Sequence, residues 1–382
     1  MEDVTDIFDG THQTPQYTDF GVKFVSVENI ATLESKKYIS QDAYEKEYSS
    51  KKAKKGDILM TRIGDIGTAR AIEKDEPLAY YVTLALLKPK EIDSNFLVWL
   101  IASPEVQHNI WKRTLHIAFP KKINLGEISQ IEMMVPRIEE QTKIGAFFKE
   151  LNHFITLHQR KLDLLKRMKQ GFLQQIFPEQ GAKIPRLRFA DFEGNWEQRK
   201  LGEILEERST MSEKSDIYPL VSFTVERGVT AKTERYEREQ LVKGDKQAKK
   251  YKVTKYNDIV YNPANLKFGA ISRNKYGQAV FSPIYVTFEV NKKFAMPEYM
   301  ERVVTRKNFI KFSLKFQQGT VYERQAVSPE DLQRLNISIP KKIEQKVIGE
   351  FFDDLDTIIT LYHRKLGAAN KLKEFYLQKM FI

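Results

Sequence analysis

The chain contains the stretch Val135-Pro-Arg-Ile-Glu-Glu-Gln-Thr-Lys-Ile-Gly-Ala-Phe-Phe-Lys-Glu-Leu151 and repeats it as Ile339-Pro-Lys-Lys-Ile-Glu-Gln-Lys-Val-Ile-Gly-Glu-Phe-Phe-Asp-Asp-Leu355. The two copies are related by a constant offset, and the alignment continues without a gap to Phe177 in the first and Phe381 in the second. Chance does not give a gapless repeat of this length, so the chain is built from two related halves.

Each copy of the repeat predicts a long helix. Apolar side chains recur at alternating intervals of three and four residues over four heptads, which is the pattern of a coiled-coil seam. Pro136 and Pro340 suit a helix start, where a missing N–H costs nothing, and each helix would run for about 60 Å. The predicted seam comprises Phe148, Leu151, Ile155, Leu162, Leu165 and Phe172 in the first copy, and Phe352, Leu355, Ile359, Tyr362, Leu366 and Tyr376 in the second.

Two interpretations of these helices are open. They form a coiled-coil spacer by pairing with each other, or each lies on its own domain as an unrelated amphipathic helix. The narrow, matching seams favour the spacer, and duplication about a pseudo-dyad requires the pair to be antiparallel. One register sets Phe148 opposite Tyr376, and the other sets Leu151 opposite Met380. Both registers place the dyad near Leu162.

The composition is that of a soluble globular protein of two or three domains. The chain has no cysteine, which excludes disulfides and thiolate chemistry and is compatible with a reducing cytoplasm. The acidic, polar N-terminus predicts no signal peptide, and no apolar run approaches bilayer length, so we expect a cytoplasmic protein without a membrane partner. The 6 histidines are scattered, and we expect no metal site.

The net charge of +11 is distributed unevenly. Lys and Arg minus Asp and Glu gives −3 for residues 1–135, +3 for 136–182, +9 for 183–338 and +2 for 339–382. A basic chain usually has a polyanionic partner, although a charged, solvated surface gives the same excess. Charge alone therefore does not decide whether the partner is nucleic acid.

The repeat divides the chain into four segments: an α/β domain (1–135), a central helix (136–180), a second α/β domain (181–338) with an opening segment (184–204), and a C-terminal helix (339–382). The second domain repeats the first weakly; for example, Val286-Thr-Phe matches Val82-Thr-Leu. The predicted fold class is α+β: two duplicated α/β domains separated by two long antiparallel coiled-coil helices with pseudo-two-fold symmetry. Elsewhere the halves differ freely, which indicates two binding units of different specificity.

The opening segment of the second domain has no visible counterpart in the first. It includes Trp196 and leads into Lys200-Leu-Gly-Glu-Ile204. The repeat offset places its first copy before Met1, and the chain starts where the second copy has about Leu205. Either the start is truncated or the first domain does without its opening strand.

Catalytic motifs are missing from the sequence. Asn262-Pro-Ala-Asn265 does not match the loop of an adenine methyltransferase, and the loop from Arg62 to Gly67 lacks the Gly-Lys-Ser/Thr of a phosphate loop. Asp353 and its acidic neighbours have the spacing of a solvated helix face. We therefore expect a chain that recognises a target while partners carry out the chemistry.

These features resemble the specificity (S) subunit of type I restriction-modification systems over essentially the whole chain. The resemblance rests on the duplicated helix, on the opening segment ending in Trp196, on Gly10-Thr-His-Gln-Thr-Pro15 and on Gly56-Asp-Ile-Leu with Gly64-Asp-Ile-Gly67. It implies two target-recognition domains alternating with two conserved helices, and a subunit that is not catalytic by itself. It also implies two modification subunits carrying S-adenosylmethionine for adenine methylation, and restriction subunits carrying ATP-driven translocation and cleavage, with Mg on the partners and no cofactor on this chain.

On this interpretation each domain reads one half of a bipartite duplex DNA site through the major groove, with Lys and Arg on phosphates and fewer polar side chains on base edges. Candidate readers in the first domain are His12, Gln13, Thr14, Arg62, Lys112, Arg113 and His116. Those in the second are Arg235, Lys249, Asn262, Asn265, Lys267, Gln317, Gln318, Tyr322 and Arg324. The alternative is a non-catalytic coiled-coil scaffold that binds nucleic acid or protein without sequence preference.

Overall fold

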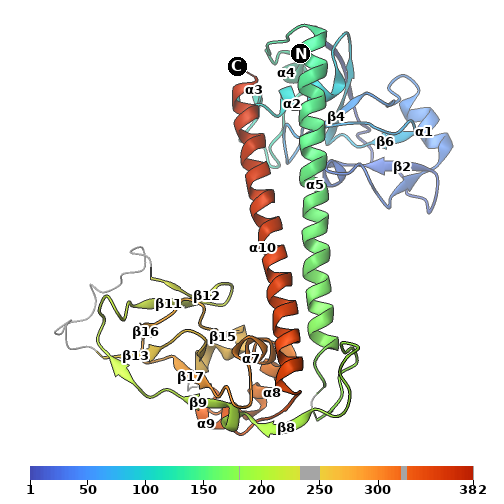
Figure 1. The fold of residues 1–382 in the computed structure, drawn as a ribbon. Helices are drawn as coiled ribbons and strands as arrows, with labels where there is room; N and C mark the ends of the chain where they lie inside the picture. Colours follow the sequence, from blue (N-terminus) through green and yellow to red (C-terminus); the bar gives the residue numbers. More distant parts are fainter. Residues whose placement is uncertain (180, 233–249, 320–324, 382) are drawn as a thin grey trace. The chain divides into compact units, whose positions relative to one another are not determined.

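A computed structural model describes residues 1–179, 181–232, 250–319 and 325–381. The chain forms two compact units (Figure 1): unit 1 comprises Met1–Arg160 with His363–Ile382, and unit 2 comprises Lys161–Tyr362. The two long helices are α5 (Ile138–Gln175) and α10 (Lys342–Lys379), each of 38 residues. Each unit thus contains one α/β domain and a part of both helices. Each helix begins two residues after its proline.

Unit 1 is built on a four-stranded antiparallel sheet. Its strand order is β1 (Thr5–Asp9), β7 (Leu84–Pro89), β4 (Ile58–Thr61) and β5 (Ala69–Ala71). Neighbouring side chains on a strand point to opposite faces, so Ala85 and Leu87 of β7 enter one hydrophobic cluster while Leu84 and Leu86 enter another. The sheet is therefore covered on both sides, which explains the continuous apolar run in the sequence.

Helices cover one face of this sheet and a smaller sheet packs on the other. The helices are α2 (Ser94–Ile101), α3 (Pro104–Arg113) and α4 (Leu125–Ser129). The smaller sheet has the order β3 (Tyr38–Ile39), β2 (Val22–Val25), β6 (Leu78–Tyr80), and α1 (Gln41–Tyr48) and the 3-10 turn η1 (Val27–Asn29) lie beside it.

Side-chain caps determine where α2 and α3 begin. Ser103 accepts a hydrogen bond from the Val106 N–H and caps α3, as the sequence predicts. The cap of α2 is a correction: Asp93 accepts from the Phe96 N–H at 2.8 Å, while the Ser94 hydroxyl donates to a backbone carbonyl in the preceding strand region. Both residues are good caps, and the strand contact decides between them.

Unit 2 repeats the architecture of unit 1, which confirms the predicted duplication. Its main sheet has the order β9 (Leu205–Glu207), β17 (Val286–Val290), β14 (Ile259–Tyr261), β15 (Ile271–Arg273). The covering helices are α7 (Pro297–Val304), α8 (Lys307–Ser313) and α9 (Pro329–Gln333). Smaller elements are β8 (Glu197–Lys200), α6 (Leu201–Ile204), β10 (Met211–Ser212), β11 (Val221–Thr224), β12 (Gly228–Ala231), β13 (Tyr251–Thr254), η4 (Pro263–Phe268), β16 (Ala279–Phe281), η5 (Leu314–Phe316) and β18 (Asn336–Ile339).

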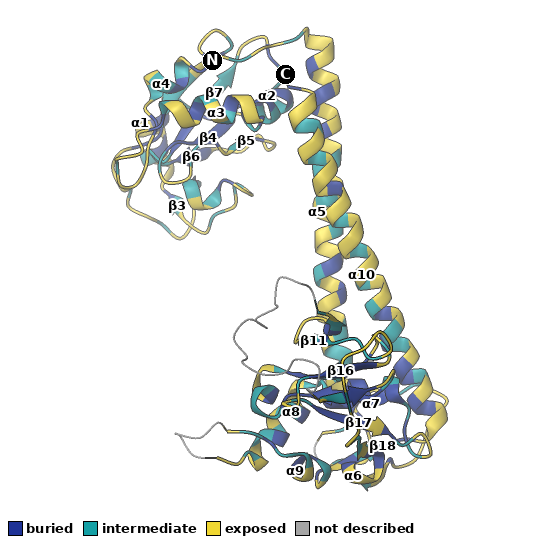
Figure 2. Ribbon diagram, turned by 90° about the vertical axis from the view of Figure 1, so that its left-hand side faces the viewer, coloured by how far each residue is buried: buried dark blue, intermediate teal, exposed yellow. Residues whose placement is uncertain are grey.

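The two long helices pack antiparallel in both units. In unit 1 the Phe147 ring, early in α5, lies 5.0 Å from that of Tyr376, late in α10. In unit 2 Phe172, late in α5, lies 5.2 Å from Phe351, early in α10. Both contacts are one residue from the register that sets Phe148 opposite Tyr376. The twelve predicted seam side chains are all buried or half-buried, as the dark stripe on each helix shows (Figure 2).

Candidate nucleic-acid interface

Asp9, at the end of β1, joins two of the predicted DNA-reading residues of unit 1. Its carboxylate lies 2.7 Å from the His12 Nε2 atom and accepts a hydrogen bond of 2.6 Å from an Arg62 terminal nitrogen. The His12 ring is exposed, but Arg62 is only 7% exposed and its Nε also donates to the Ile123 carbonyl. The prediction that Arg62 reads bases is therefore corrected, because a buried guanidinium with these partners fixes the loops instead.

A third loop, residues 115–122, lies beside the other two. The Gly64 N–H donates to the Lys121 carbonyl at 2.8 Å, and the His116 ring nitrogen lies 2.9 Å from the Trp111 carbonyl. Arg113 is half-buried and held by neighbouring polar side chains. The exposed polar residues on these loops and at the end of α3 are His12, Gln13, Thr14, Lys112, His116, Lys121 and Lys122.

The corresponding loops of unit 2 also lie side by side. The Tyr261 hydroxyl donates to the Val327 carbonyl at 3.1 Å, which joins the η4 loop to the segment after η5. Gln318 is exposed, but its amide donates to Asp331. Asn262 is a second correction: it is 4% exposed and its side chain accepts from the Ala264 N–H, so it closes the η4 turn.

The remaining predicted residues of unit 2 divide into two groups. Asn265 and Gln317 are half-buried, and Lys267 is exposed. Arg235, Lys249, Tyr322 and Arg324 lie outside the described residues, together with most of the lysine-rich stretch that precedes β13.

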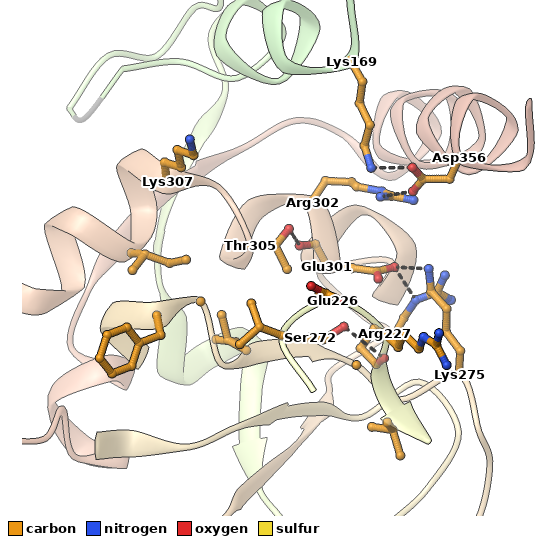
Figure 3. Close-up of a pocket in the computed structure, with 18 of the residues that line it drawn as sticks. Lys169, Glu226, Arg227, Ser272, Lys275, Glu301, Arg302, Thr305, Lys307 and Asp356 are labelled. Carbon is orange, nitrogen blue, oxygen red and sulfur yellow. Dashed lines mark hydrogen bonds and ion pairs between the residues drawn. The ribbon is translucent and has the colours of Figure 1, made fainter. Parts of the chain in front are cut away.

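A pocket of about 820 Å³ opens in unit 2 between the β11–β12 turn, η4, β15 and the helices α7, α8 and α10. Figure 3 shows Lys307 and Arg227 on different sides of it. Lys307 and Lys311 are four residues apart on α8 and so share one helix face. The cations that line this pocket, are exposed and form no ion pair with any described residue are Arg227, Lys267, Lys307 and Lys311. We call these four residues the rim cations.

Sequence reasoning found only Lys267 among the rim cations. The other three come from a turn near residue 227 and from α8, which lie far apart in the chain and meet only in the fold. The available signal was the +9 charge of residues 183–338, which indicates a basic domain but not a basic pocket.

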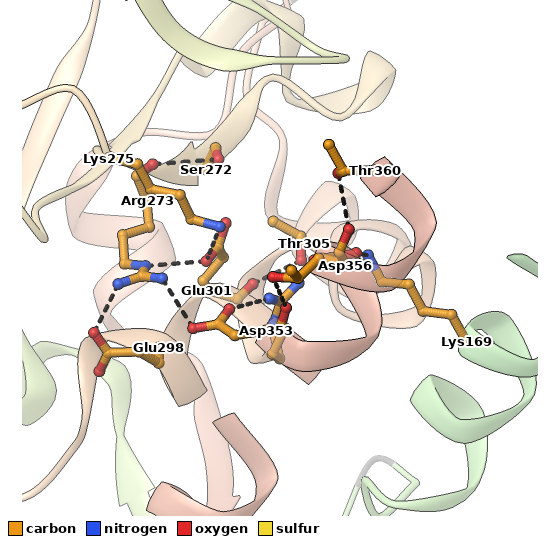
Figure 4. A network of polar contacts seen from close by, with 12 residues as sticks. Lys169, Ser272, Arg273, Lys275, Glu298, Glu301, Thr305, Asp353, Asp356 and Thr360 are labelled. Carbon is orange, nitrogen blue, oxygen red and sulfur yellow. Dashed lines mark hydrogen bonds and ion pairs between the residues drawn. The ribbon is translucent and has the colours of Figure 1, made fainter. Parts of the chain in front are cut away.

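The floor of the pocket is a buried network in which charges are matched (Figure 4). Arg302, with a side chain 5% exposed, pairs with Asp356 at 2.7 Å and also with Asp353. Arg273, 4% exposed, pairs with Glu301 at 3.0 Å and Glu298 at 2.7 Å. Lys169 on α5 and Lys275 complete the network, which then holds four cations and four carboxylates.

The pKa values of this floor reflect the pairing. Burial alone would raise the pKa of Asp356, but the hydrogen bond from Lys169 and the charge of Arg302 outweigh it and leave that pKa below its ordinary value. Burial likewise lowers the pKa of Arg302, and its acidic neighbours overcome this and raise it. Because the floor is neutralised internally, only the rim cations have charge available for an anionic ligand.

The chemistry of this surface is recognition. Within the described residues no group of three or more His, Asp or Glu side chains has a geometry that holds a metal ion. Among the same residues, no helix has the length and apolarity to cross a membrane. Polar loops at one end of each α/β domain, and a basic rim on unit 2, suit an extended polyanion.

Two α/β domains with paired long helices and these surfaces define a nucleic-acid-recognition protein. The family model described as "Type I restriction modification DNA specificity domain" matches residues 3–167 and 193–371, and the chain belongs to this family. The putative type I restriction enzyme MjaX specificity subunit of Methanocaldococcus jannaschii is 21% identical over 342 residues, which cover 84% of this chain and 76% of that protein.

Two solved structures share the fold. The S subunit of a type I restriction-modification system from M. genitalium aligns with a TM-score of 0.65 at 14% identity, over 100% of this chain and 94% of that one. The HsdS subunit from Thermoanaerobacter tengcongensis aligns with a TM-score of 0.45 at 15% identity, over 100% and 95%. As a specificity subunit the chain recognises the target sequence within a type I complex and is not itself catalytic. This confirms the predicted function over the scaffold without sequence preference.

Proposed function

We propose that each unit reads one half of a bipartite duplex target, and that the rim cations of unit 2 hold the phosphate backbone. The observation that carries the proposal is the rim itself: four exposed cations without ion pairs among the described residues surround a pocket whose floor is already neutral. Cations of this kind neutralise phosphates and set the register of a protein on DNA, but they do not distinguish bases.

Unit 1 is proposed to rely more on hydrogen bonds to base edges. Its three loops present His12, Gln13 and Thr14 beside His116, with Lys121 and Lys122 as the nearest exposed cations. Side chains of these types pair with donors and acceptors in the major groove. The excess of acidic residues in 1–135 leaves fewer cations for phosphate contacts than unit 2 has.

The partners and cofactors follow from membership of a type I complex. We propose that the paired helices offer docking surfaces to two modification subunits, which bind S-adenosylmethionine, and that restriction subunits bind ATP and Mg. The specificity chain is proposed to bind no cofactor itself.

Selection from a random duplex library, with the full chain in complex with modification subunits, tests the bipartite target. We expect two short motifs separated by a fixed gap, with centres about one helical turn apart. A single motif, or two motifs with a variable gap, would contradict the proposal that both units read DNA.

Salt dependence tests the rim. Each phosphate contact contributes about 0.9 to the slope of log affinity against log salt, so Lys307→Gln and Lys311→Gln should each lower the slope by about 1. The same loss should occur on any DNA sequence, since phosphate contacts carry no base information. Lys341→Gln is the matched control: it removes the same charge from an exposed position of unit 2 that does not line the pocket.

A further inference from the structure

The opening segment covers one surface of unit 2 in three ways. Its strand β8 pairs antiparallel with β18, which sets Glu197 opposite Ile339. Trp196, 2% exposed, packs over Phe177 and Tyr299 with ring centroids 6.4 and 6.2 Å away. The third contact is a salt bridge from Arg188 to Glu344, described next.

The salt bridge is bidentate and buried. The Nε and a terminal nitrogen of Arg188 donate to the two carboxylate oxygens of Glu344 at 2.8 and 2.7 Å, and the Glu344 side chain is 2% exposed. Burying a carboxylate is favourable only when it is paired in this way. The opening segment therefore combines an arginine, a tryptophan eight residues later, and a strand.

Unit 1 has the same surface. By the repeat offset Phe381 corresponds to Phe177, and Phe96 occupies the place in α2 that Tyr299 has in α7. The two ring pairs have the same geometry, with centroids 5.7 Å apart in unit 1 and 5.5 Å in unit 2. The N–H groups also correspond: Met1 donates to the Ile131 carbonyl as the first residue of α6 donates to its own partner.

Among the described residues of unit 1, nothing occupies the place of Trp196. A pocket of about 240 Å³ lies there, lined by Phe96, Phe381, Val135 and Glu140 among others. The aromatic pair that supports Trp196 in unit 2 thus forms part of an open apolar hollow in unit 1.

The backbone edge beside this pocket is also unpaired. Residues 132–135 correspond to β18, but no strand and no backbone hydrogen bond to them is found within the described residues. Met134 is 74% exposed, and Val135 is 38% exposed whereas its counterpart Ile339 is 3% exposed. An open apolar edge of this kind is a template for an added strand.

The carboxylate of unit 1 lacks its cation. Glu140 corresponds to Glu344, and it is exposed and forms no ion pair with any described residue. Pocket, edge and carboxylate are the three features that one segment satisfies in unit 2, and they have the same spacing along the repeat in unit 1.

We propose that this surface of unit 1 binds an extended segment of a separate partner polypeptide, with an arginine for Glu140, a tryptophan eight residues later for the pocket, and a strand along 132–135. A second copy of this chain fits less well as the donor. Its own segment would have to leave buried contacts at Trp196 and Glu344 to reach the site, so exchange would gain little.

The probe is a labelled peptide with the sequence of residues 184–200, titrated into the full chain. We expect one peptide per chain. Glu140→Gln should weaken binding about tenfold, since a hydrogen-bonded charge pair is lost. Glu139→Gln is the matched control, because it removes a neighbouring exposed carboxylate that has no counterpart contact. A peptide carrying Trp196→Ala should bind at least tenfold more weakly.

A disulfide trap tests the register, and the chain has no cysteine to interfere. Residues directly opposite in an antiparallel pair have Cα atoms about 4.5–5.5 Å apart, a distance that a disulfide spans. The full chain with Val135→Cys should therefore trap a peptide carrying Glu197→Cys. Met134→Cys should trap it poorly, because neighbouring side chains on a strand point to opposite faces.

Three results would overturn the proposal. They are absence of saturable peptide binding, equal trapping at the two cysteine positions, and a concentration-dependent dimer of the chain that excludes the peptide. The last result would identify a second copy as the occupant.

Discussion

Trp99 of unit 1 and Arg302 of unit 2 occupy the same position, the sixth residue of α2 and of α7, where each α/β domain meets the long helices. In unit 1 the Trp99 ring stacks on Phe148 at 5.3 Å, and the Lys373 ammonium lies 4.6 Å from the Trp99 ring centroid. In unit 2 Arg302 instead pairs with the carboxylates of Asp353 and Asp356. The same joint is apolar in one unit and ionic in the other.

The difference shows that the duplicated scaffold fixes where the joint lies but not its chemistry. Apolar burial is insensitive to pH and salt, whereas a buried ionic network is sensitive to pH and costs desolvation. Lys373 illustrates the contrast: burial lowers its pKa, and the nearest printed partner is the neutral amide of Asn152 at 3.3 Å. Its counterpart Lys169 faces the carboxylate of Asp356.

Trp99→Ala should have the largest effect on this comparison. Removing a buried aromatic side chain costs about 3–5 kcal/mol, and here the cation–π contact of Lys373 is lost as well. We expect hydrogen exchange of α2 and of the adjoining part of α5 to accelerate accordingly. Trp111→Ala is the control, because Trp111 is 60% exposed and its loss should leave exchange nearly unchanged. Equal effects of the two changes would mean that Trp99 does not support the joint.

Arg302→Met breaks the ionic joint and should cost about 3 kcal/mol, near the lower end for removing one partner of a buried pair. Lys169 and Arg273 remain to compensate the two carboxylates, which keeps the effect below that of Trp99→Ala. Hydrogen exchange of α7 is the measurement. A neutral or stabilising result would show that packing, and not the network, holds this domain to the helices.

The repeat made the joints' location predictable, but not their chemistry or the site. The heptad positions of Phe148 and Leu162 follow from periodicity alone, and both side chains are buried. Arg62 was predicted to read DNA because a polar residue in a glycine-containing loop is usually exposed. Its partner Asp9 lies 53 positions away in the chain, and only the sheet brings them together.

The pocket of unit 2 was missed for the same reason. Its rim combines residues near 227, 267 and 307, and no local pattern in the sequence links these segments. Asn262 shows the opposite error: its local pattern fits a polar loop, but the turn uses its side chain internally. Patterns within one element were predictable, and contacts between distant segments were not.

Acidification should separate the two joints. The pKa of Asp356 is below its ordinary value of 3.8, so its contribution to stability is fully present above that value and is lost as the pH falls through the lower folded-state pKa. We expect hydrogen exchange of α7, corrected for intrinsic rate, to accelerate in this range while that of α2 changes less. Asp356→Asn should reduce the difference and cost on the order of 1 kcal/mol at neutral pH. If the variant retains the full acid response, another carboxylate is responsible.

Asn152→Asp is the reciprocal change and should have the smallest effect. Asn152 corresponds to Asp356 by the repeat offset, so the substitution gives Lys373 the carboxylate that Lys169 already has. The new pair should stabilise unit 1 by about 0.5 kcal/mol at neutral pH, because one partner is only half-buried and water screens the attraction. The new carboxyl should have a depressed pKa beside Lys373, so the gain should disappear on acidification and at high salt. A double-mutant cycle with Lys373→Met isolates the pair from the change at Asn152 itself. A coupling energy of zero would mean that Lys373 serves only the Trp99 ring, and that the apolar joint cannot be converted to the ionic one by a single carboxylate.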